Sequence, residues 1–141
     1  PYTDGFATPD GKMRLVEKAP QPIATNDDYP LLLASPSNRH WQTSQYDPRD
    51  QPAVPLCRIH PRAVRAAGLQ DAQQALLVSP IGRLRVQLEL DERMPPDCCE
   101  VLRGSWLAYG GGVNQLIAPL VTDMGGGAAF MDQWVRLEST T

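Results

Sequence analysis

Alternation of apolar and polar residues is clearest over Arg83–Leu90, where Leu or Val occupies every second position between Arg, Gln and Glu. A period of two is that of a β-strand with one buried face. The apolar run Ala75–Ser79 comes just before it, and Pro80–Gly82 between them supplies turn residues. The pattern therefore predicts a β-hairpin.

Shorter apolar runs on both sides of the hairpin predict further strands. Prolines, glycines or polar residues flank them: Tyr29–Ala34, Leu56–Ile59, Cys99–Leu102 and Trp134–Glu138. A weaker alternation predicts a short strand over Lys12–Lys18, and Asn114–Ile117 predicts either a brief strand or a helical turn. Fourteen prolines and eleven glycines among 141 residues keep the elements short, which favours a small barrel or sandwich.

One short helix is predicted between the strands. Pro61 suits a first helical position, the residues Ala63, Val64 and Ala67 share one face, and Gly68 is placed to end the helix. For the preceding His60 a capping or packing role is favoured over catalysis. Tyr46–Pro55, with its prolines, is predicted to hold neither a central strand nor a helix.

The run Tyr29–Ala34 leads into a stretch that is dense with hydrogen-bonding side chains. Ser35–Gln45 combines hydroxyl, amide, guanidinium, imidazole and indole groups. A strand that delivers such a loop to a sheet edge can build a ligand site, and His40 is the better functional candidate of the two histidines. A plain polar surface loop is the alternative, and composition alone leaves both open.

The net charge and the sequence motifs limit the kinds of function that can be expected of this chain. The formal net charge is −3 without a basic stripe, and no apolar run reaches about 18 residues, so neither nucleic-acid binding nor membrane contact is expected. Glycine clusters at Gly110 and Gly125 do not complete a dinucleotide fingerprint, and no phosphate loop, nucleophile elbow or metal-binding helix motif occurs. The chain resembles a binder more than a complete enzyme.

Three cysteines, Cys57, Cys98 and Cys99, form no disulfide framework and no Cys-x-x-Cys pair. We expect buried free thiols and a reducing compartment. The first residues lack both an initiator Met and the basic and apolar parts of a signal peptide. This start suggests a fragment of a longer chain.

A series of short motifs follows in a defined order: Phe6–Lys12, Asp28–Leu33, Asn38–Trp41, Ile59–Pro61, Ala66–Leu69, Ser79–Arg83, Gly104–Trp106, Asn114–Leu116 and Val135–Glu138. In this order they resemble the C-terminal molybdopterin-dinucleotide-binding domain of the dimethyl-sulfoxide-reductase and formate-dehydrogenase superfamily of molybdenum and tungsten oxidoreductases. The resemblance implies a mainly β fold, a six-stranded double-psi β-barrel with one or more short helices. It also implies a division into an approach segment, residues 1–28, and the barrel, residues 29–141.

The resemblance further implies that the domain binds and positions a molybdopterin guanine dinucleotide, one of two that hold Mo or W in the full enzyme. The metal ligand and any iron–sulfur cluster are expected from upstream domains, so the isolated fragment is not expected to be active. Arg39 is the expected anionic partner. The expected cofactor-binding residues are Ser35, Asn38, Arg39, His40, Trp41, Ser44, Gln45 and Asn114.

The sequence departs from the family pattern at three places. Phe130-Met131 stands where many relatives carry Tyr-Lys, which leaves a ring for stacking but removes a lysine charge. Asp71–Ala75 replaces an Asp-Gly-Asp turn. Arg62 places a positive charge at a helix start, where the helix dipole favours an acidic residue.

The expected partners are the upstream domains of the same chain and an electron-transfer subunit, and a cytoplasmic location is favoured over a periplasmic one. An alternative is a small separate double-psi-barrel subunit that serves as a structural partner in a molybdenum or tungsten enzyme complex. A further alternative, an unrelated barrel acting on polysaccharide or protein, would require a catalytic carboxylate in a cleft. The substrate and the choice between Mo and W cannot be read from these residues.

Overall fold

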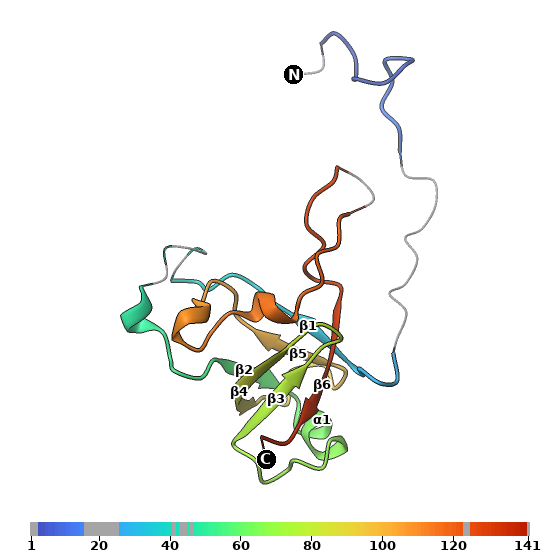
Figure 1. Cartoon of the computed structure of the whole chain (residues 1–141). Helices are drawn as coiled ribbons and strands as arrows, with labels where there is room; N and C mark the ends of the chain where they lie inside the picture. The colour runs from blue at the N-terminus through green and yellow to red at the C-terminus, as the bar shows by residue number, and fades with distance from the viewer. Residues whose placement is uncertain are drawn as a thin grey trace.

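The computed structural model describes residues 3–15, 26–40, 42, 45, 47–122 and 125–140. Within them, six strands close into a barrel in the order β1-β5-β2-β4-β3-β6 (Figure 1). The strands are β1 (Leu31–Ala34), β2 (Leu56–Ile59), β3 (Gln74–Val78), β4 (Arg83–Leu90), β5 (Cys98–Val101) and β6 (Gln133–Glu138). The helical elements are α1 (Pro61–Ala66) and the 3-10 helices η2 (Pro48–Asp50), η3 (Leu107–Tyr109) and η4 (Val113–Leu116).

Two strand pairs of the barrel are parallel, β1 with β5 and β2 with β4, and the other four pairs are antiparallel. Because parallel partners need long crossovers, β1 and β5, and likewise β2 and β4, are far apart in the sequence, whereas the antiparallel β3 and β4 are joined by a short turn. Closure leaves no strand with an unpaired edge. The prediction of a mainly β, double-psi type barrel with short helices is confirmed.

The barrel interior holds one hydrophobic core with members from every strand. On β4 the predicted alternation holds for the first half, where Leu84 and Val86 are buried between the exposed Arg83 and Arg85. It is wrong at the end of the strand, since Leu90 is 54% exposed. Leu90 is the last residue of β4 and pairs with Ile59, the last residue of β2.

Helix α1 begins at Pro61, and the Nδ1 atom of His60 accepts a hydrogen bond from the Arg62 N–H group at 2.9 Å. The predicted capping role of His60 is therefore confirmed. Gly68 adopts a φ of +71° just past the helix, as expected for a glycine that ends it. Ala63 and Val64 are buried, whereas Ala67, predicted to share their face of the helix, is the C-cap residue and is exposed.

The hairpin of β3 and β4 forms as predicted. The Ser79 Oγ atom accepts a hydrogen bond from the Gly82 N–H group at 3.2 Å, which closes the turn. A Cβ atom at position 82 would collide with the carbonyl oxygen of Gln115 in η4, so a glycine is needed for this close approach. The turn thus supports η4, which is the helical of the two forms predicted for Asn114–Ile117.

Other predictions need correction. Residues 12–15 form no strand, and residues 16–18 of the same prediction lie outside the described part. The segment predicted to hold no helix contains the single turn η2, which tolerates Pro48 at its first position. Cys57 and Cys99 are buried free thiols as predicted, whereas Cys98 is only half-buried on the outward side of β5. The boundary at residues 28 and 29 stays a prediction.

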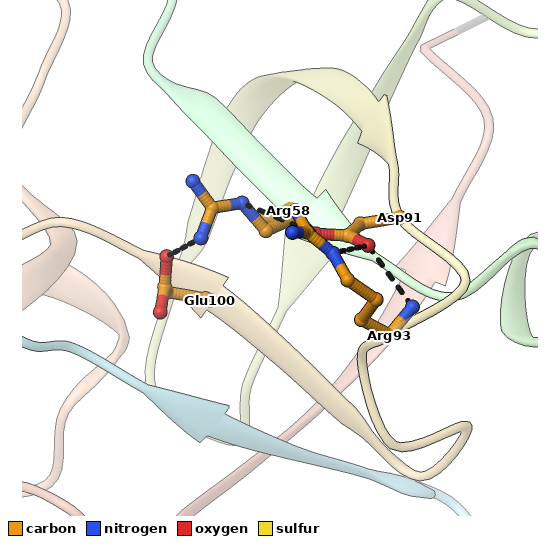
Figure 2. A network of polar contacts seen from close by, with 4 residues as sticks. All are labelled: Arg58, Asp91, Arg93 and Glu100. Atoms are coloured by element: carbon orange, nitrogen blue, oxygen red, sulfur yellow. Dashed lines mark hydrogen bonds and ion pairs between the residues drawn. The ribbon is translucent and has the colours of Figure 1, made fainter.

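An ion-pair network of Arg58, Asp91, Arg93 and Glu100 lies beside β2, β4 and β5 (Figure 2). Arg58 on β2 reaches Glu100 on β5 at 3.1 Å and Asp91, just after β4, at 3.9 Å. Asp91 also pairs with Arg93 at 2.8 Å. Hydrogen bonds from the Arg93 side chain and its backbone N–H group lower the pKa of Asp91 to about 2. The network links β2 to both of its neighbours in the barrel.

Candidate functional site

The loops that follow β1 and β5 are joined side by side. The Arg103 N–H group donates to the Pro36 carbonyl at 3.0 Å, and a bridge between Ser37 and Arg103 extends the parallel pairing of the two strands. The Arg103 side chain adds hydrogen bonds to the Ser37 Oγ atom, from Nη2 at 2.7 Å and from Nε at 3.1 Å. Residues distant in sequence therefore form one polar surface.

Adjoining cavities open on this surface. The first, of about 470 Å³, is lined by residues 103–107 and 112–115. The second, of about 360 Å³, shares Arg103 and Asn114 with the first and extends from Ser35 to Phe130. The third, of about 210 Å³, meets the first at Ser105. Arg103 and Asn114 thus form a wall that two of the cavities share.

Arg103 is half-buried in this wall, and its guanidinium lies 4.8 Å from the centroid of the Phe130 ring. Among the described residues no carboxylate oxygen lies within 4.0 Å of it, whereas the half-buried Arg58 and Arg136 pair with Glu100 and Glu138. A charged group that is withdrawn from water needs a compensating partner. The guanidinium is therefore suited to receive an anion from outside the domain.

Gln51 fixes the wall of the first cavity. Its Nε2 atom donates to the carbonyl oxygens of Trp106 and Tyr109, each at 3.0 Å, and its Oε1 atom accepts from the Trp106 N–H group at 2.6 Å. Gly110 has a φ of +85°, and a Cβ atom there would collide with the Ala53 carbonyl. The segment of residues 105–110 is thereby held against the segment after η2.

Gln133 fixes the wall of the second cavity in a similar way. It is buried at the start of β6, accepts from the Ala118 N–H group at 2.9 Å and donates to the Trp134 carbonyl at 3.0 Å. Beyond Ala118 the chain runs away from the barrel and returns, with a bridge between Val121 and Ala128 (Figure 1). The base of this extension forms one side of the cavity.

Three of the predicted site residues line these cavities. Ser35 is fully buried beside the second cavity, and its Oγ atom donates to the Phe130 carbonyl at 3.5 Å. Asn114 faces the first and the second cavities from η4. Asn38 lines the third, with its Oδ1 atom accepting from the His40 N–H group at 2.8 Å. The structure thus brings together residues predicted from two separate segments.

The remaining predicted residues lie elsewhere. Arg39, His40 and Gln45 are exposed and line none of these three cavities, and Trp41 and Ser44 lie outside the described residues. Arg103 and Gln51 were not among the residues predicted for the site. A signal for Arg103 was available, since this arginine opens the glycine- and aromatic-rich stretch directly after a strand.

The described residues were also compared with the requirements of a metal site and of a membrane-spanning helix. No group of three His, Cys, Asp or Glu side chains is placed to hold a metal ion within the described ranges. None of the helices in this part of the chain is long and apolar enough to cross a membrane. The donors gathered at the cavities are instead amide, hydroxyl and guanidinium groups, which bind and orient a polar ligand.

Comparison with known proteins places this geometry in a family. The family model described as "Molydopterin dinucleotide binding domain" matches residues 32–134. Among solved structures, acetylene hydratase from Pelobacter acetylenicus is similar, with a TM-score of 0.73 and 19% sequence identity. The match covers 96% of the present chain and 24% of the acetylene hydratase chain, so the present chain spans about a quarter of that protein. The chain belongs to the molybdopterin dinucleotide binding domain family.

Proposed function

We propose that the domain binds and positions a molybdopterin guanine dinucleotide within a longer molybdenum or tungsten oxidoreductase. The observation that carries the proposal is the shared wall of Arg103 and Asn114 between two adjoining cavities. A dinucleotide consists of two flat heterocyclic halves joined by a diphosphate. A two-part site of this kind suits such a ligand.

The residues at the site fit the chemistry of this cofactor. The Asn114 amide and the Ser35 hydroxyl can meet the fixed donor and acceptor edges of a pterin or a guanine. Trp106 and Phe130 contribute apolar rings to the first and second cavities, and flat ligands pack against such rings. When bound, the cofactor supplies the metal chemistry of the enzyme. The residues of this domain hold and orient it.

We further propose that the metal ligand comes from another part of the longer protein. A thiol must lose its proton to bind a metal. Cys57 and Cys99 are fully buried in the barrel core, and the contact with Cys57 together with burial raises the pKa of Cys99 well above its usual range. Neither cysteine lines the cavities described above.

The partner in this proposal is the preceding part of the same protein, which would complete the cofactor site. The acetylene hydratase chain, four times as long as the matched region, supports the expectation of a longer protein. The whole coding sequence provides a direct check. Upstream molybdopterin domains in the same reading frame would favour the domain over a separate structural subunit.

The decisive experiment measures bound cofactor in the full-length protein, purified from cells that synthesise molybdopterin guanine dinucleotide. Pterin fluorescence and GMP released by acid hydrolysis would be quantified per protein chain. We expect Asn114→Ala to lower cofactor content severalfold, because it removes an amide from the shared wall.

Gln70→Ala, an exposed position in the connection between α1 and β3, is the matched control and should leave the content unchanged. A wild-type protein that carries neither pterin nor guanine nucleotide would refute the proposed function. Full cofactor content in the Asn114→Ala variant would show that the cofactor does not bind at these cavities.

A further inference from the structure

We propose that Arg103 is the residue that contacts the diphosphate of the bound dinucleotide, in place of Arg39. This inference rests on the proposed function and adds to it the position of the ligand's charge. Arg103 lines both the first and the second cavity, at the point where they meet. The linking diphosphate of a ligand that occupies both cavities must pass this point.

The Arg103 side chain is held in place before any ligand arrives. Its backbone N–H group donates a hydrogen bond to the Pro36 carbonyl, and its Nε and Nη2 atoms donate to the Ser37 hydroxyl. Its guanidinium stacks on the Phe130 ring. An arginine normally loses considerable rotamer freedom when it binds a ligand. Here Ser37 and Phe130 have already imposed much of that restriction, so less affinity is lost on binding.

The donors of Arg103 are also suited to a phosphate group. A guanidinium carries five N–H groups in a planar fork that matches two phosphate oxygens. Ser37 engages the Nε and Nη2 atoms, and no carboxylate of the described residues lies within 4.0 Å. The positive charge of Arg103 is therefore not neutralised within the described part of the domain.

Arg39 lacks these properties. It is exposed and lines none of the three cavities described above. An exposed guanidinium is screened by solvent, which weakens its attraction to an anion. The assignment of the anionic contact therefore moves from the loop after β1 to the residue at the start of the loop after β5.

The test compares a probe that contains a diphosphate with one that lacks it. Calorimetry on the full-length protein, produced in cells unable to make molybdopterin, would give dissociation constants for GDP and for guanosine. Arg103→Gln should weaken GDP binding roughly 10- to 100-fold, the loss of a charge-assisted hydrogen-bonded contact, and leave guanosine binding unchanged. Arg39→Gln is the matched control and should leave both constants unchanged.

Arg103→Lys provides a second variant that keeps the charge but loses the planar fork, so we expect an intermediate loss for GDP. It also carries the test if thermal unfolding shows that the Gln variant does not fold. An equal loss for GDP and guanosine in the Arg103 variants would assign a structural role to Arg103 and overturn the inference. A loss of GDP binding, without loss of guanosine binding, that occurred only in Arg39→Gln would also overturn the inference.

Three further outcomes distinguish the possible sources of the anion and distinguish this inference from the proposed function. Binding of inorganic phosphate that depends on Arg103, with GDP binding unaffected, would assign Arg103 to a free oxyanion and overturn the inference. Failure of the wild-type protein to bind GDP, together with absence of cofactor from the purified enzyme, would refute the proposed function itself. Cofactor retention that depends on Asn114 but not on Arg103 would leave the function standing and refute only this assignment.

Discussion

Neighbouring residues shift the pKa of a charged side chain on the outside of the barrel. Asp91 is only 14% exposed at its side chain and lies between Arg58 and Arg93 (Figure 2). Its pKa falls to about 2, chiefly because Arg93 donates hydrogen bonds to the ionised carboxylate. The folded state therefore holds this carboxylate in its charged form more firmly than the unfolded chain does, and folding is coupled to its ionisation.

This coupling predicts how stability depends on pH. Because the pKa of Asp91 is lowered on folding, its contribution is fully present above about pH 4 and is lost as the pH falls toward about 2. We expect Asp91→Asn to lower stability at pH 7 and to flatten the loss of stability between about pH 4 and 2. Urea denaturation at a series of pH values measures both effects.

The pKa of Asp47 is also lowered to about 2, by Arg49. Asp47 should therefore still contribute to the dependence of the unfolding free energy on pH in the Asp91→Asn variant. Asp71→Asn, at an exposed position, is the control and should leave the pH profile unchanged. A profile of Asp91→Asn that parallels the wild type over the whole range would contradict the role of Asp91.

At the scale of elements, the site depends on two glutamines that hold loops in place, Gln51 at the end of η2 and Gln133 at the start of β6. Gln51 holds residues 105–110 through three hydrogen bonds, and Gln133 holds the start of the extension at Ala118. Each amide both donates and accepts, so a single side chain satisfies several backbone groups that a loop would otherwise leave to water. The cavity walls are therefore loops of defined position.

The Gln51 contacts predict that loss of this side chain disorders the loop of residues 105–111 without destabilising the barrel. Gln51→Ala should increase amide hydrogen exchange over residues 105–111 and weaken GDP binding severalfold, because the wall of the first cavity loses its anchor. The thermal midpoint should change little, since the segment lies outside the barrel core. Exchange mass spectrometry and calorimetry measure the two effects.

Gln51→Glu refines this test. A carboxylate can still accept from the Trp106 N–H group but cannot donate to the two carbonyl oxygens, so we expect an effect at least as large as that of alanine on GDP binding. Gln70→Ala should leave exchange over residues 105–111 as in the wild type. Unchanged exchange in both Gln51 variants would show that the loop does not depend on this clamp.

The sequence predicted local features better than the site. β2 and β4 were predicted to the residue, because period and flanking prolines are properties of neighbouring residues. Ser35 and Asn114 were placed by resemblance and line the cavities. Arg103 was missed, because its role depends on the pairing of β1 with β5, and that pairing joins residues more than sixty positions apart.

For the whole molecule, closure of the barrel makes every strand depend on two partners. β1 is bonded to β5 on one side and to β6 on the other, and Leu33 at its centre is fully buried in the single core. The cavities lie on loops that leave these same strands. The barrel therefore acts as a rigid base that sets the distance between Ser35, Arg103 and Asn114.

Because every strand depends on two partners, one core substitution should lower the stability of the whole barrel. Leu33→Ala should lower the free energy of unfolding by about 2–5 kcal/mol, since it removes buried methyl groups and leaves a cavity in a core with no free edge to rearrange. The matched control is Leu90→Ala, at 54% exposure on β4, for which a change within about 0.5 kcal/mol is expected. Urea denaturation followed by both far-UV circular dichroism and tryptophan fluorescence provides the measurement. Coincident transitions are expected in both variants, because one core serves all six strands, and separated transitions in Leu33→Ala would contradict the view that the barrel unfolds as a single unit.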